Sequence, residues 1–211
     1  EAAGLVRARE RLGTEALVLQ TDAGKVAALP ALMQHVQEQF GGLDVLVLNA
    51  GVSGALPIAQ VSEARFDEIM DVNVKGLFFT LQHALPLLSS PASVIVTTSI
   101  TNRLGSPHFS VYAASKAAAR SLVQAAALEL VGRGIRVNAI SPGPIDTPIY
   151  DRVGLPAGMV QDIKNGIAQR SPSGRFGTPD EVARVALFLA SDDSAYVVGE
   201  EIIVDGGMSL L

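Results

Sequence analysis

The 211-residue sequence contains no cysteine and only three histidines. Without cysteine, disulfide bonds and thiolate metal ligands are excluded. His35, His83 and His108 are scattered along the chain, so we expect no metal site. No apolar run reaches the roughly 18 residues of a membrane-spanning helix. No cationic leader precedes an apolar segment, as it would in a signal peptide. We therefore expect no membrane association.

Positive charge is also scarce. There are 16 Lys and Arg residues against 21 Asp and Glu, for a net charge of −5. A pI near 5.2 argues against nucleic acid as a partner. With 48% apolar and 18% charged residues, the composition is that of a globular protein. No repeat, linker or low-complexity tract marks a boundary, so we expect a single domain over residues 1–211.

Short apolar segments alternate with helical patterns along the chain. We expect strands at residues 16–19, 45–48, 94–98, 135–140 and 202–204. We expect helices at residues 2–12, 26–40, 63–88, 111–131, 159–169 and 179–190. Residues 45–48 are apolar on both faces, as in a central parallel strand. The alternation predicts an α/β fold in which helices cover both faces of a parallel sheet.

Tyr112 and Lys116 lie four residues apart in a strongly helical segment, V-Y-A-A-S-K. This spacing places both side chains on one helix face. A lysine charge beside a phenol favours the phenolate and should lower the tyrosine pKa. Tyr112 is therefore a candidate general acid or base. Taken alone, such a pair is more often a half-buried ring and a solvated amine.

Turn residues directly follow three predicted strands: Asn49, Ala50 and Gly51; Ser99; and Pro142, Gly143 and Pro144. The carboxyl ends of parallel strands share one edge of a sheet, where ligands bind. Gly51 and Gly143 would let the backbone approach a flat ligand closely, although each alone is more often a plain turn. Their convergence with Tyr112 and Lys116 predicts a binding site at this edge.

A set of motifs follows in a fixed order: Asn49-Ala50-Gly51, Asp71-Val72-Asn73-Val74, Ser99, Tyr112-Ala113-Ala114-Ser115-Lys116, Arg136-Val137-Asn138, Pro142-Gly143 with Thr147, and Asp205-Gly206-Gly207. With them the chain, from about residue 22 onward, resembles a compact short-chain dehydrogenase/reductase. The resemblance implies a Rossmann-like, doubly wound sheet. It also implies an NAD- or NADP-dependent oxidoreductase that transfers hydride between the nicotinamide and a carbonyl or secondary alcohol.

The resemblance implies catalytic roles for four residues. Tyr112 resembles the residue that exchanges a proton with the reacting oxygen, and Ser99 the residue that orients that oxygen. Lys116 resembles the residue that binds the nicotinamide ribose and lowers the tyrosine pKa. Asn73 resembles the helix residue that holds a water in the proton relay. Further cofactor contacts are expected from Asp22, Asn49, Ala50, Gly51, Pro142, Gly143, Ile145 and Thr147.

The chain departs from the family pattern at its start. The opening β-α-β segment and its T-G-x-x-x-G-x-G phosphate turn are not in this sequence, a difference of roughly 30 to 40 residues. Their absence would leave a gap in the middle of the sheet. We therefore expect the sequence to be an incomplete record of a longer chain. The acid or base that selects NAD or NADP belongs to the same segment, so the choice cannot be read.

Two other functions remain open: an epimerase or dehydratase that uses the same Tyr and Lys, and a non-catalytic scaffold or binding protein. We expect residues 147–175, rich in Pro and Gly, to form a mobile flap over the site. The helices at residues 63–88 and 111–131 are rich in apolar and small residues, which predicts a homodimer or homotetramer. The resemblance adds the C-terminal strand as a second contact and implies a cytoplasmic enzyme.

Overall fold

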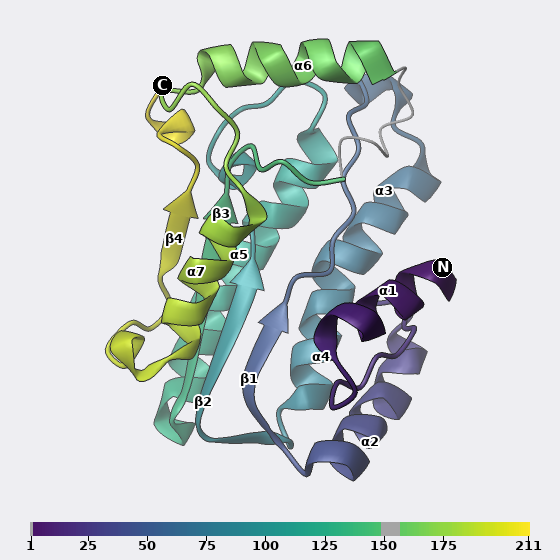
Figure 1. Cartoon of the computed structure of the whole chain (residues 1–211), viewed down its shortest axis with the longest axis vertical. Coiled ribbons are helices and arrows are strands. Elements are labelled where there is room, and N and C mark those ends of the chain that lie inside the picture. Colours follow the sequence, from purple (N-terminus) through teal and green to yellow (C-terminus); the bar gives the residue numbers. More distant parts are fainter. Residues whose placement is uncertain (1, 149–156) are drawn as a thin grey trace.

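The structure is a computed structural model that describes residues 2–148 and 157–211. Its strands form one sheet in the order β1 (Leu43–Leu48), β2 (Leu88–Thr97), β3 (Ile135–Pro142) and β4 (Glu201–Val204). Each neighbouring pair is parallel, so the carboxyl ends of the strands lie at one edge of the sheet (Figure 1). The predicted parallel sheet is confirmed, and the strands expected at residues 45–48, 94–98, 135–140 and 202–204 are its members.

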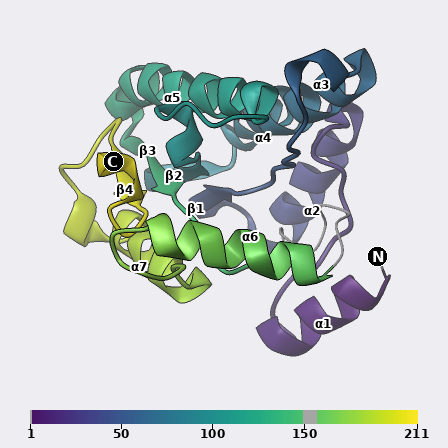
Figure 2. The same cartoon turned by 90° about the horizontal axis from the view of Figure 1, so that it is seen from above.

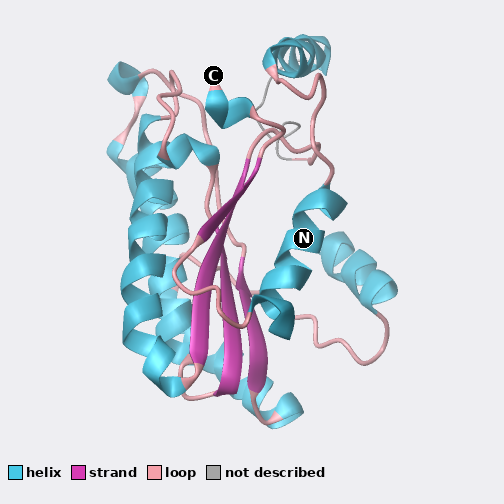
Figure 3. Ribbon diagram, turned by 90° about the vertical axis from the view of Figure 1, so that its left-hand side faces the viewer, coloured by secondary structure: helices cyan, strands magenta, loops and turns pink. Residues whose placement is uncertain are grey.

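Helices cover both faces of the sheet, as predicted. They are α1 (Ala2–Leu12), α2 (Leu29–Phe40), α3 (Glu63–Met70), α4 (Leu77–Ala84), α5 (Ser110–Leu130), α6 (Ala157–Arg170) and α7 (Pro179–Ala190). On one face, Leu81 of α4 and Val123 of α5 pack with strand residues such as Val137. On the other, Leu189 of α7 packs with Ile95 and Ile140. The two helical layers stand on either side of the sheet in Figures 2 and 3, and α6 lies beyond the strand ends in Figure 1.

Capping residues explain where several helices begin. The Ser62 hydroxyl accepts a hydrogen bond from the Arg65 amide at the start of α3. Thr178 and Glu181 form a capping box at the start of α7, which also has Pro179 in its first turn. None of the helices in the described ranges combines the length and apolarity that a bilayer crossing requires.

The prediction of a strand at residues 16–19 is wrong. These residues form no strand, and the sheet begins with β1 in the part of the chain that the structure describes. A strand needs a neighbour to take its backbone hydrogen bonds, and none is available there. Among the described residues β1 lies at the edge of the sheet, next to β2. Val45 and Val47 are 38% and 51% exposed on it.

The prediction of one uninterrupted helix over residues 63–88 is also wrong. α3 ends at Met70, a π-helical segment spans Asp71–Gly76, and α4 ends at Ala84. Pro86 cannot continue a helix, and Leu88 already belongs to β2. Short π-helical segments inside helices often mark functional sites. The one here places Asn73 in the candidate site.

Candidate active site

Three strand ends bring the predicted segments together. Leu48 of β1 pairs with Val96 of β2, and Thr97 of β2 pairs with Ile140 of β3. The residues that follow these strands therefore lie at the same level of one sheet edge. Asn49, Ala50 and Gly51 are exposed there, as a ligand contact requires. The turns after β1, β2 and β3 thus share one edge of the sheet, and a binding site at this edge stays a prediction.

Tyr112 lies on the first turn of α5, and its hydroxyl is close enough to the side chain of Ser99, which follows Thr98 after β2, for Ser99 to affect its pKa. Burial raises the pKa of Tyr112 above its ordinary value of 10.0, and the Ser99 side chain opposes that rise. We expected Lys116 to lower this pKa. That expectation is wrong, because desolvation is the largest effect on the phenol and raises its pKa.

Lys116 is 4% exposed, so the solvated-amine interpretation is wrong as well. Its Nζ donates a hydrogen bond to the Thr97 carbonyl at 2.7 Å and lies 5.8 Å from the centre of the Tyr112 ring. Burial lowers the pKa of Lys116 from 10.5 to about 8. An ammonium group has three N–H donors. The bond to Thr97 uses one of them, which leaves capacity for ligand hydroxyls beside the phenol.

Asn73 holds the turn after β1 against helix α5. Its Oδ1 accepts a hydrogen bond from the Val52 amide at 2.8 Å, and its Nδ2 donates to the Val52 carbonyl and the Ser115 hydroxyl, both at 2.9 Å. The Ser115 hydroxyl donates in turn to the Tyr112 carbonyl at 2.7 Å. The buried Asn73 amide thus links the turn after β1 to helix α5, and we call this set of hydrogen bonds the Asn73 clamp. Sequence reasoning gave no role to Ser115, although a serine between the tyrosine and the lysine was a usable signal.

Gly51 and Gly143, the glycines of two of these turns, pack against different neighbours. A Cβ on Gly51 would lie 3.4 Å from the Asn73 Oδ1 and 3.5 Å from the Lys116 Nζ, so this turn borders the polar cluster. A Cβ on Gly143 would lie 2.5 Å from the Asp205 Cβ. Close packing against Asp205 is therefore what requires glycine at position 143.

The other predicted cofactor contacts lie around this cluster. The Asp22 side chain is exposed and accepts a hydrogen bond from the Gly24 amide. A Cβ on Gly76 would collide with the Ala23 carbonyl, so the turn of Asp22 packs against the π-helical segment. Pro142 is the last residue of β3 and is half-buried. No contact in the described residues links Asp22 to the tyrosine–lysine pair.

Thr147 begins the expected flap and Ile145 lies just before it; both are half-buried. Ile145 forms a β-bridge with Gly177, and Asp146 pairs with Lys164 of α6 at 2.8 Å. The short helix expected at residues 159–169 is confirmed as part of α6. The flap residues 149–156 lie outside the described part of the chain.

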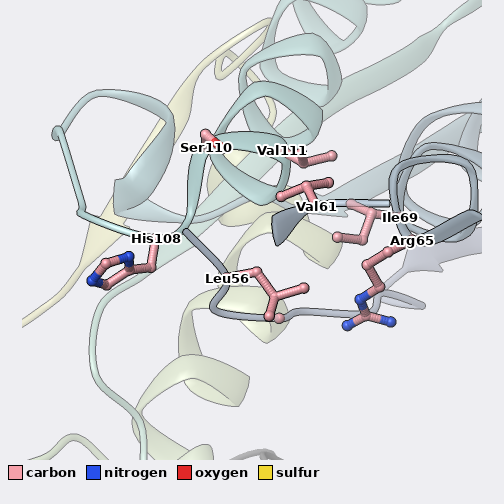
Figure 4. Close-up of a pocket in the computed structure, with 8 residues that line it drawn as sticks. Leu56, Val61, Arg65, Ile69, His108, Ser110 and Val111 are labelled. Carbon is pink, nitrogen blue, oxygen red and sulfur yellow. The ribbon is translucent and has the colours of Figure 1, made fainter. Parts of the chain in front are cut away.

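A small cavity lies between the turn after β1, α3 and the start of α5 (Figure 4). Its lining is mostly apolar, with His108 and Arg65 at its ends. The His108 backbone has a φ of 69°, which is strained for a residue other than glycine. The His108 carbonyl accepts a hydrogen bond from the Leu56 amide at 2.8 Å, which joins the two loops. Ser99, Tyr112 and Lys116 do not line this cavity.

Comparison with known proteins gives a consistent picture. A family model described as Enoyl-(Acyl carrier protein) reductase matches residues 2–209. The chain is 39% identical over 179 residues to a 3-oxoacyl-[acyl-carrier-protein] reductase FabG from Thermotoga maritima, a match that covers 84% of this chain and 70% of that protein. It is 37% identical over 209 residues to 3beta-hydroxysteroid dehydrogenase 1 from Eggerthella lenta, covering 97% and 78% of the two chains.

A solved structure matches the fold over nearly the whole chain. It is a short-chain dehydrogenase/reductase described as glucose/ribitol dehydrogenase, from Brucella melitensis, with 31% identity and a TM-score of 0.91. The match covers 99% of this chain and 83% of that structure. The names of these similar proteins cover an acyl carrier thioester, a steroid and a sugar. Similarity therefore points to one type of reaction and not to one substrate.

Proposed function

Because the chain belongs to the short-chain dehydrogenase/reductase family, whose members are NAD(P)-dependent oxidoreductases of carbonyls and alcohols, we propose that Tyr112, Ser99 and Lys116 carry out its chemistry. The observation that supports this assignment is the gathering of Ser99, Tyr112 and the buried Lys116 at one strand end, where the Lys116 Nζ donates to the Thr97 carbonyl and lies 5.8 Å from the centre of the Tyr112 ring. The matches favour this enzyme over the non-catalytic scaffold.

Tyr112 is proposed to exchange the proton. Ketone reduction requires a proton donor at the carbonyl oxygen, and alcohol oxidation requires a base at the same place. A phenol whose pKa is raised by burial keeps its proton at neutral pH, as a donor must. The Ser99 side chain lies close enough to the phenol to favour its ionised form. Ser99 is then placed to orient the substrate oxygen while Tyr112 transfers the proton.

The residues around Lys116 fit the nicotinamide ribose of the cofactor. A buried ammonium with unused donors suits vicinal hydroxyls, and the exposed turn at Asn49, Ala50 and Gly51 lies beside it. Bound NAD(P)H supplies the hydride. Asp22, Pro142, Gly143, Ile145 and Thr147 are proposed to make further contacts with the cofactor. The 211 residues contain no glycine-rich phosphate turn, so none of them is assigned to the pyrophosphate.

Cofactor titration tests this assignment and also decides between NADH and NADPH. Each reduced cofactor is added to the protein and its fluorescence is followed. Lys116→Met should weaken binding of the preferred cofactor by roughly 10-fold, the loss of a hydrogen bond to a charged group. Lys75→Met removes an exposed lysine that pairs with Asp71 and not with a proposed cofactor contact, and is the matched control. Unchanged affinity in Lys116→Met would reject the ribose role.

We also propose that the protein is a homodimer or homotetramer. Large apolar side chains are exposed on two separate surfaces: Phe78, Leu128 and Val131 on α4 and α5, and Leu187, Tyr196 and Val198 around α7 and β4. Apolar surfaces of this kind suit contact with a second copy. Light scattering should give a dimer or tetramer mass, and Leu128→Glu should shift it towards smaller species. A monomer mass for the unmodified protein would reject the assembly. A cytoplasmic location stays a prediction, to be tested by cell fractionation.

A further inference from the structure

Glu201 opens β4 with a charged side chain that is only 4% exposed. The next residues of the strand, Ile202, Ile203 and Val204, are apolar. A buried carboxylate lowers stability unless other groups pair with it and donate hydrogen bonds to it. A hydrophobic side chain would serve the packing at this position equally well. The carboxylate therefore indicates a requirement other than packing.

The Glu201 carboxylate reaches across β3 to the end of β2. Its strand partner on β3 is Ala139, a small and fully buried residue that leaves room for the longer side chain. On the far side, the Thr98 hydroxyl donates to the Glu201 Oε1 at 2.5 Å, and the Asn102 Nδ2 donates to the same oxygen at 2.6 Å. Glu201 thus joins strands that are not neighbours in the sheet.

The second carboxylate oxygen is paired with two arginines. The Arg103 Nη2 and Nε donate to the Glu201 Oε2 at 2.6 and 3.0 Å. The Arg120 Nε lies 3.2 Å from the same oxygen. Both arginines are about one third exposed and line a polar pocket together with Glu200 and Glu201. Their charges stabilise the carboxylate and attach it to two further segments.

The residues that bind Glu201 lie on the segment that carries Ser99 and on the helix that carries Tyr112. Thr98 directly precedes Ser99, and Asn102 and Arg103 end the short turn that the Ser99 side chain caps. Arg120 lies four residues after Lys116 and eight after Tyr112 on α5, so all three lie near one face of the helix. A single carboxylate is thereby bonded to both sides of the segment that carries Ser99 and to the helix that carries Tyr112.

We propose that Glu201 is a positioning residue that holds the Ser99 segment against helix α5, so that the Ser99 hydroxyl stays at Tyr112. This proposal rests on the proposed function of Ser99 and Tyr112. The competing explanation is an ion pair that only fastens β4 to α5. That explanation predicts lower stability and an unchanged kcat for the folded protein, whereas a positioning role predicts a lower kcat.

Glu201→Gln tests the proposal while keeping the shape of the side chain. The amide can still accept from Thr98 and Asn102, but it loses the charge that attracts Arg103 and Arg120. A small displacement of a reacting group lowers the rate strongly, so we expect kcat to fall about 10- to 100-fold. The KM for the reduced cofactor should change less than about 2-fold. Kinetics are measured with the best substrate from a panel of ethyl acetoacetate, cyclohexanone, a 3-ketosteroid and an aldohexose.

Glu200→Gln is the matched control, because Glu200 is the exposed neighbour of Glu201 in the chain. It should leave kcat and the unfolding temperature unchanged. An equal fall in kcat for both variants would overturn the proposal, because the effect would then be one of general charge. A lower unfolding temperature for Glu201→Gln with normal kcat would overturn it in favour of the structural ion pair.

A double-mutant cycle separates the proposal from the proposed function. If Glu201 acts through Ser99, Glu201→Gln should change kcat less than about 2-fold in a Ser99→Ala background. Full additivity of the two changes would overturn the positioning role. If Ser99→Ala alone leaves kcat unchanged, the proposed function of Ser99 fails instead. Thr98→Val gives a second route should Glu201→Gln not fold: it removes one bond to Glu201, leaves the ion pairs in place, and should also lower kcat. A normal kcat in Thr98→Val would contradict the proposal.

Discussion

Two stretches of the chain have similar helical sequence patterns but form different structures. Residues 110–130 form one continuous helix, α5, whereas residues 63–84 are divided into α3, a π-helical segment and α4. The continuous helix keeps Tyr112 and Lys116 on one face. The divided one turns the Asn73 amide onto the backbone of Val52 and the hydroxyl of Ser115. The continuous helix α5 thus sets the spacing of Tyr112 and Lys116. The π-helical segment between α3 and α4 lets Asn73 bind the turn after β1 to α5.

The largest effect should come from the continuous helix. Tyr112→Phe keeps the ring but removes the hydroxyl, so kcat should fall about 100- to 10,000-fold, as for other losses of a general acid or base. Steady-state kinetics with the ketone panel measures it. Tyr196→Phe is the matched control, because Tyr196 is fully exposed, and it should retain normal turnover. A Tyr112→Phe protein with most of its activity would show that another group moves the proton.

The divided helix should matter chiefly for stability. Asn73→Ala removes three hydrogen bonds and leaves the backbone of Val52 without these partners. We expect the free energy of unfolding to fall by about 2 to 3 kcal/mol, the cost of buried polar groups left unsatisfied. Urea unfolding measures the change. Asn165→Ala, on the exposed surface of α6, should stay within about 0.5 kcal/mol. Equal stability of the two variants would mean that the Asn73 clamp contributes little.

A smaller effect should appear in the pH dependence of stability. Burial lowers the pKa of Lys116 to about 8, against an ordinary value of 10.5. Above pH 8 the unfolded chain therefore holds more protons at this position than the folded one, and stability should gain from this residue as the pH rises towards 10.5. The raised pKa of Tyr112 keeps that group protonated in both states below its ordinary value of 10.0.

Urea unfolding at pH 8 and at pH 10 measures this change in stability, because the two pH values span most of the interval between the folded and unfolded pKa values of Lys116. Lys116→Met should lose the gain that the unmodified protein shows, whereas Lys25→Met, which changes an exposed lysine, should keep it. The same pH dependence in all three proteins would show that Lys116 is not buried as its contacts indicate.

Much of the sheet and its site could be predicted from the sequence, because local patterns carried the information. Short apolar segments followed by turn residues located all four strands of the sheet and the edge where Ser99, Tyr112 and Lys116 meet. The four-residue spacing fixed the helix face. Burial was harder to predict: the spacing of Tyr112 and Lys116 gave no measure of their desolvation, which dominates both pKa values.

The errors concern interactions between distant parts of the chain. The strand expected at residues 16–19 needs a neighbouring strand, which no local pattern can supply. The interruption at Asn73 depends on Val52 and Ser115, which are 21 and 42 residues away in the sequence. Glu201 was missed because it lies about 100 residues from Thr98, Asn102 and Arg103. An acid as the first residue of an apolar strand, next to a second acid at position 200, was its only local signal.

The central claim is that Tyr112 and Ser99 together bind the reacting oxygen. A crystal structure of the protein with its reduced cofactor and a ketone of the panel tests this most directly. The carbonyl oxygen should lie within about 2.6 to 3.2 Å of both the Tyr112 and the Ser99 hydroxyl oxygens, the range for proton transfer through a hydrogen bond. A carbonyl oxygen bound by other side chains, with Tyr112 out of hydrogen-bond reach, would contradict the account.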